Sequence, residues 1–224
     1  MTVLEGKLNE LKERVFEMAS LVEEMLASGI RGLVKREPAL CHKVINELEP
    51  RVNRLEVENE DAAIGLIALY QPEASNLRTI ISCIKLAGDL ERIGDHAVNI
   101  CEAALYLVDR PEVKPLIDLP KMADQTVAML HDSLDAFVHA RPEQARDVCR
   151  RDSSVDELKS LITKELVEYM KRDPETVERA LRLIMITLNL ERVADLATNI
   201  SEEAIYIAQG ENIKHCQSEA TEKE

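Results

Sequence analysis

The sequence predicts an all-α protein built from two tandem antiparallel three-helix bundles. Composition is the first reason: 46% of the 224 residues are hydrophobic and 31% are charged, yet only 3% are aromatic and only seven are glycine. Such a chain is rich in helix formers and poor in turn and strand residues. The second reason is an internal repeat, since residues 90–110 and 190–210 are identical at ten of 21 positions. The chain is long enough for each copy to bury a small core.

Each half is expected to hold three helices. In chain order, the helical pattern predicts them over these ranges: 3–36, 38–69, 76–108, 118–140, 142–171 and 174–209. Pro38 and Pro142 suit the first turn of a helix, where a missing N–H has no consequence. Pro50 falls inside the second range, so that helix must kink or break there.

The stretch "DRPEVKPLIDLP", residues 109–120, separates the two halves because its three prolines interrupt the helical pattern. We therefore expect a first bundle over 1–110 and a second over 118–210. A polar C-terminal tail, expected to fray, follows over 211–224.

Both third helices carry an apolar seam whose residues recur at alternating steps of four and three. The seam residues are Leu86, Leu90, Ile93, Ala97, Ile100, Ala104 and Leu107, and Ile186, Leu190, Val193, Ala197, Ile200, Ala204 and Ile207. This spacing predicts the face that packs inside a bundle.

A polar stripe is repeated along with the seam. Its members are Glu91, Asp95, Asn99, Glu102 and Tyr106, which return as Glu191, Asp195, Asn199, Glu202 and Tyr206. At about 100° per residue the stripe is expected nearly opposite the seam, on the outward face. Outward positions of the first helices are not kept between the halves, so binding explains the stripe better than a solvated acidic face does.

Carboxylates four residues apart on a helix lie about 6 Å from each other and can hold one cation between them. Oxygen ligands suit magnesium, manganese, calcium or iron better than they suit zinc of the thiolate-bound kind. The second helices add acid at Glu49 and Asp152, more weakly in the second half because Lys159 follows. The candidate metal ligands are therefore Glu91, Asp95, Asn99, Glu191, Asp195, Asn199, Glu49 and Asp152.

The net charge of −14 argues against direct binding of nucleic acid and against adsorption to anionic lipid. The N-terminus "MTVLEGKLNELKERV" has no apolar signal-peptide core, and the longest apolar run is "AAIGLIALY". A cytoplasmic protein without a membrane span is therefore expected. No histidine has a glutamate three residues before it, which excludes the di-iron helical motif. Because nucleophile motifs are also absent, no enzymatic activity is expected.

The segments "LERIGDHAVNI" and "LERVADLATNI" resemble the duplicated E(D)xxxD signature of the PhoU family, the accessory proteins of phosphate-specific transport. The resemblance extends over about residues 3–210 and includes "YQPEASNLR" and "MLHDSLDAF". It implies candidate metal sites at Glu91–Asp95 and Glu191–Asp195, with Asn99 and Asn199 in the same register. Metal clusters, notably of iron or zinc, occupy this motif in some members of the family, and other members are metal-free. The second copy departs from the first at Ala194 and Leu196, where the first has Gly94 and His96.

The resemblance also implies a function. It indicates a cytoplasmic regulator, usually a homodimer, that restrains the phosphate-starvation response when phosphate is plentiful. Such a protein links the ATPase subunit of the phosphate ABC transporter to a phosphate-sensing histidine kinase, and it meets the membrane only through these partners. Two alternatives stay open: a helical scaffold with metal-free acidic docking faces, and an accessory protein of an inorganic-phosphate permease.

Overall fold

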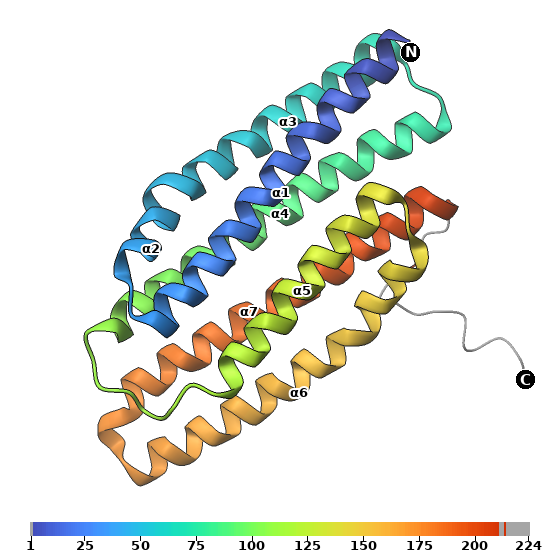
Figure 1. Cartoon of the computed structure of the whole chain (residues 1–224). Coiled ribbons are helices and arrows are strands. Elements are labelled where there is room, and N and C mark those ends of the chain that lie inside the picture. Colours follow the sequence, from blue (N-terminus) through green and yellow to red (C-terminus); the bar gives the residue numbers. More distant parts are fainter. Residues whose placement is uncertain (1, 211–212, 214–224) are drawn as a thin grey trace, which may run out of the picture.

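The computed structural model describes residues 2–210 and 213. Within these residues the fold is helical without a strand, and it consists of two three-helix bundles (Figure 1). Bundle 1 contains α1 (Val3–Lys35), α2 (Pro38–Lys43), η1 (Val44–Leu48), α3 (Glu49–Tyr70) and α4 (Ala74–Val108). Bundle 2 contains α5 (Asp118–His139), α6 (Pro142–Arg172), η2 (Pro174–Thr176) and α7 (Val177–Gln209). The expected polar tail lies outside the described residues, apart from Ile213.

None of the helices in the described part of the chain is long and apolar enough to cross a membrane. The expected helices agree with the observed ones to within a few residues, because their ends carry recognisable signals. Thr2 and Glu5 form a capping box at the start of α1. At its end, Arg36 adopts a left-handed conformation, and its side chain donates hydrogen bonds to the carbonyls of Val108 and Arg110. This contact joins the end of α1 to the end of α4.

The second helix of bundle 1 is interrupted by a π-helical turn, η1. The turn directly precedes Pro50, which lacks an N–H and cannot sit comfortably inside a regular α-helix. The turn also absorbs one residue that bundle 2 lacks. The corresponding prolines Pro38 and Pro142 lie 104 residues apart, whereas the corresponding buried valines Val52 and Val155 lie 103 residues apart. Beyond η1, residues of α3 therefore correspond to residues of α6 at an offset of 103.

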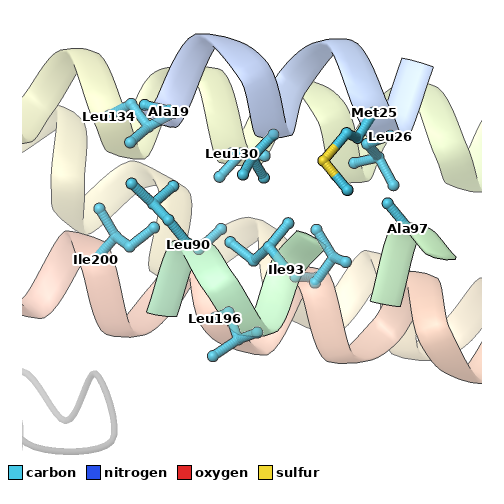
Figure 2. Close-up of a cluster of buried hydrophobic side chains, with 14 of the residues drawn as sticks. Ala19, Met25, Leu26, Leu90, Ile93, Ala97, Leu130, Leu134, Leu196 and Ile200 are labelled. Carbon is cyan, nitrogen blue, oxygen red and sulfur yellow. The ribbon is translucent and has the colours of Figure 1, made fainter. Parts of the chain in front are cut away.

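The expected seam is confirmed. All of its members are buried except Leu107 and Ile207, which are half-buried near the helix ends. Cys83 and Cys101 are also buried. The core does not stop at the bundle boundary, since buried side chains of both bundles form one continuous cluster. Figure 2 shows Met25, Leu90 and Ile93 of bundle 1 beside Leu130 and Ile200 of bundle 2.

The third helices, α4 and α7, lie at the centre of the molecule and pack against each other. They are antiparallel, because Ser82 and Lys85 pair with Glu203 at one end and Tyr106 pairs with Glu178 at the other. The first helices, α1 and α5, also contact each other, and α3 and α6 flank the centre on either side (Figure 1). The polar stripes of α4 and α7 therefore lie on one face of the molecule. This four-helix face is formed by α3, α4, α7 and α6.

Candidate binding faces of the third helices

The polar stripes do not point straight out to solvent as the helical geometry suggested. Glu91 is half-buried beside α3, and Glu191 is only 13% exposed beside α6. The reason is that α3 and α6 pack along the edge of the third helices and cover the first carboxylate of each pair. Asp95 stays exposed, and the Asp195 side chain is 41% exposed. One acid of each pair, Glu91 or Asp195, thus lines a groove beside the second and third helices of its own bundle.

In bundle 1 acidic side chains of both α3 and α4 surround Glu91, although Lys85 and Arg92 also line the groove. Glu91 faces Glu49 and Glu56 of α3, and Asp95 lies beside it on α4. Burial, followed by the charges of Asp95 and Glu56, raises the pKa of the Glu91 carboxyl above its usual value. Asn53 donates a hydrogen bond of 2.6 Å to Glu49, but it adds no positive charge. The structure therefore brings together Glu49, Glu91 and Asp95, as expected from the sequence.

In bundle 2 the first acid of the pair, Glu191, faces a lysine of α6. The ammonium of Lys159 lies 2.9 Å from Glu191 Oε1 and 2.8 Å from Asp156 Oδ1. Asp152 lies in the same cluster, where burial and the charges of Asp195, Asp156 and Glu191 raise its pKa to about 6. Asp152, Glu191 and Asp195 are therefore together as expected, but a basic side chain of the same protein accompanies them.

The two asparagines of the stripe have a different environment from the carboxylates. Asn99 donates a hydrogen bond of 3.3 Å to Asn189 Oδ1 across the α4–α7 contact, and His96 Nδ1 lies 2.8 Å from the same oxygen. Asn199 lines the space between the bundles, beside Arg92 and Glu202. These contacts place both asparagines toward the partner bundle. His96 is half-buried there.

Two connected grooves run over the four-helix face. The bundle 1 groove, about 520 Å³, lies between α3, α4 and α7 and is lined by Glu56, Glu91 and Glu202 among others. The bundle 2 groove, about 690 Å³, lies between α4, α6 and α7 and is lined by Asp152, Asp195 and Glu202 among others. Both grooves include Arg92, Asn199 and Glu202, so Glu91 of one acidic pair and Asp195 of the other line one shared surface.

The resemblance implies metal sites at the two acidic pairs. Among the described residues, no group of three or more Asp, Glu, His or Cys side chains is placed so that it could hold a metal ion. The side chains as they stand therefore do not fit a preformed metal centre, and metal binding stays a prediction. A cluster of carboxylates of this kind suits the binding of a cation or of a basic group.

Three polar residues of the shared face were not identified from the sequence. Asn189 joins His96 and Asn99 to α7, and Glu203 accepts hydrogen bonds from Ser82 and Lys85. Glu178 pairs with Tyr106. The repeat gave no signal for them, because the residues at the matching positions of the other copy are different: Asp89, Ala103 and Arg78. These residues make the contact between the two bundles. Aligning the sequence of one bundle with that of the other does not reveal such contacts.

Comparisons with known proteins agree with the geometry. The family model described as "PhoU domain" matches residues 15–104 and 119–204. The phosphate-specific transport system accessory protein PhoU homolog 2 of Thermotoga maritima is 38% identical over 95% of this chain and 90% of its own. The PhoU accessory protein of Escherichia coli is 32% identical over 97% of this chain and 90% of its own.

Solved structures show the same fold. The crystal structure of PhoU from Pseudomonas aeruginosa superposes with a TM-score of 0.89 at 31% identity, over 92% of this chain and 99% of that chain. The phosphate transport system regulatory protein PhoU from Streptococcus pneumoniae gives a TM-score of 0.86 at 28% identity, over 94% and 99%. The match covers both bundles and both E(D)xxxD pairs, and the chain belongs to the PhoU family of regulatory accessory proteins, which are not enzymes.

Proposed function

We propose that this chain is a cytoplasmic negative regulator of the phosphate-starvation response and a modulator of phosphate uptake. It acts as an adaptor between the ATPase subunit of a phosphate ABC transporter and a phosphate-sensing histidine kinase. The observation that carries the proposal is the family match over both bundles, with relatives named as accessory proteins of the phosphate-specific transport system. The paired acids Glu91–Asp95 and Glu191–Asp195 stand in the matching motifs.

The fold supports an adaptor in a physical sense. The core is continuous across the two bundles, so the grooves are held in a fixed relation to each other. Both grooves are rich in carboxylates, which favours partners that present basic segments or cations. Partners meeting different parts of this face are thereby held at a fixed distance. A homodimer, and contact with the membrane through partners alone, belong to the same proposal.

The test is deletion of the gene in its own bacterium, followed by measurement of phosphate-starvation transcripts in phosphate-rich medium. We expect strong derepression that is reversed by the intact gene. Complementation by the double variant Asp95→Asn, Asp195→Asn then reports whether the acidic pairs are needed, provided that the variant accumulates to the same level. Unchanged transcripts after deletion contradict the regulatory role.

Two other functions are distinguished by the same strains. If the protein is a scaffold with metal-free docking faces, the Asp95→Asn, Asp195→Asn variant fails to restore repression. The metal content of the purified native protein then has no bearing on repression. An accessory protein of an inorganic-phosphate permease predicts altered phosphate uptake in a strain that lacks the ABC transporter. The proposed function predicts that the deletion has no effect on uptake in that strain.

A further inference from the structure

The two grooves carry opposite charges at one matching position. At the offset of 103 that holds beyond η1, Glu56 of α3 corresponds to Lys159 of α6. Their neighbours support this register, because the buried Leu55 and Leu158 precede them at the same offset. Each side chain faces the first acid of its own motif, Glu91 in one bundle and Glu191 in the other. Bundle 2 therefore supplies a cation where bundle 1 supplies another carboxylate.

The Lys159 ammonium is held firmly in its place. It makes two short ion pairs, of 2.9 Å to Glu191 and 2.8 Å to Asp156, and its side chain is only 26% exposed. The Glu191 side chain is 13% exposed, so this pair is largely removed from bulk water. An ion pair in such a setting is screened much less by salt than one on an open surface.

The other carboxylate oxygens of the bundle 2 motif also have basic neighbours. Arg192 Nε lies 3.6 Å from Glu191 Oε2, and its Nη1 lies 3.0 Å from Asp195 Oδ2. In bundle 1 the corresponding Arg92 pairs instead with Asp89, at 3.3 Å. Both acids of the second motif are thus matched by positive charge from within the chain, whereas those of the first motif have no such ion pair among the described residues.

We infer that Lys159 acts as a tethered cation that keeps a metal ion off the bundle 2 face. A divalent ion held by the motif needs the Glu191 oxygen that Lys159 occupies, together with the Asp195 carboxylate, as ligands. To bind them it has to displace an ammonium that is covalently attached and therefore always present. The displaced ammonium then remains within a few ångströms of the metal and repels it. The duplicated motif is accordingly not equivalent in its two copies, although its two acids are repeated without change.

The test is titration of the full-length protein with Mn²⁺, followed by calorimetry and by thermal unfolding. In the native protein, Glu191→Gln is expected to leave the number of bound Mn²⁺ ions per chain unchanged. Lys159→Met is expected to bind one additional Mn²⁺ per chain and to unfold at a higher temperature with Mn²⁺ than with a chelator. Adding Glu191→Gln to Lys159→Met is expected to abolish this gain.

Two control variants accompany the test. Lys159→Arg keeps the positive charge and is expected to bind as the native protein does. Lys164→Met removes an exposed lysine from the same helix and is expected to gain no Mn²⁺. If Glu191→Gln lowers Mn²⁺ binding in the native protein, or if Lys159→Met gains none, the inference is overturned. Should Lys159→Met not fold, Lys159→Gln replaces it. None of these outcomes depends on whether the chain regulates phosphate genes.

Discussion

The third helices of the two bundles carry the same polar stripe, yet the second helices that face it differ in charge. Around Glu91 the neighbours on α3 are Glu49 and Glu56, whereas around Glu191 the neighbours on α6 include Lys159. A repeated motif therefore sits in two different electrostatic settings. The difference teaches that the motif alone does not determine what a face binds, because the facing helix decides how much of its charge is already compensated.

The same comparison extends to the interior. At matching positions, Ile93 and Val193 are both fully buried, but the buried Asn59 of bundle 1 corresponds to the buried Ile162 of bundle 2. Near the groove, the half-buried Asp89 corresponds to Asn189. At each mismatched pair, the residue of one bundle can be replaced by the type of residue that the other bundle has. Each such substitution has an expected effect on stability.

The largest effect is expected from a charge in the shared seam. Ile93→Asp and Val193→Asp each place a carboxyl group in the core, at a site with 0% exposure (Figure 2 shows Ile93). Each is expected to lower the free energy of unfolding by about 4 kcal/mol or more. Because the core is continuous, helicity should be lost from the whole chain in one urea transition followed by circular dichroism.

The control for the seam variants is Leu188→Asp, at a site that is 46% exposed, where little change is expected. If Ile93→Asp instead removes about half of the helical signal and leaves a second transition, the bundles fold independently. That result would contradict the cooperative core.

A smaller effect of opposite sign is expected from Asn59→Leu. The Asn59 side chain is 1% exposed, and neither its amide nitrogen nor its oxygen has a hydrogen-bond partner among the described residues. Replacing it with an apolar residue of similar shape, as bundle 2 does with Ile162, should stabilise the protein by about 1–3 kcal/mol. The urea midpoint measures the gain, and the reverse change Ile162→Asn should lower it. A loss of stability in Asn59→Leu would indicate that the amide binds an internal water.

A pH-dependent effect is expected from Asp89→Asn, which gives bundle 1 the residue of bundle 2. Burial is the main cause that raises the pKa of Asp89 from 3.8 to about 6. The charged form is therefore disfavoured in the fold, so Asp89 lowers stability above pH 6 and this penalty fades as the pH falls toward 4. The variant should gain about 1–2 kcal/mol at neutral pH, since the lost ion pair with Arg92 offsets part of the benefit.

Urea midpoints of Asp89→Asn and the native protein, compared across this pH range, check the sign. The difference is expected at neutral pH and should vanish near pH 4. Asp152, whose pKa is also about 6, titrates in the same range and is present in both proteins, so it cancels in the comparison. A difference that persists unchanged at low pH would mean that burial of the charge is not its cause.

The smallest effect is expected from Glu56→Lys, which gives the bundle 1 groove the ammonium of the bundle 2 groove. It should bring the raised pKa of Glu91 back down and stabilise the protein by about 0.5–1 kcal/mol. The melting temperature at low and high salt measures this, because screening should remove the gain. The matched control is Glu60→Lys, an exposed site one turn further along α3. An equal gain in both variants would reflect net charge rather than the groove.

The sequence by itself determined the helices, the seam and the duplicated acid pairs. Prolines, glycine scarcity and the steps of three and four residues are local signals, and the helix ends followed them to within a few residues. The seam was predictable because a helix must bury its apolar stripe against something. Pro50 likewise indicated the break that η1 provides. The companion acids Glu49 and Asp152 were predictable because the second helix of a three-helix bundle must lie beside the third.

Only the tertiary structure decided what each face meets. Helical periodicity gives the direction of a side chain relative to its own helix, but it says nothing of the neighbour packed there. The stripe was therefore expected in solvent, whereas α3 and α6 cover Glu91 and Glu191. The antiparallel contact of α4 with α7 likewise places His96 beside its partner Asn189. The ion pair of Lys159 with Glu191 makes the surroundings of the second motif different from those of the first. These contacts join residues far apart in sequence, so no local pattern could specify them.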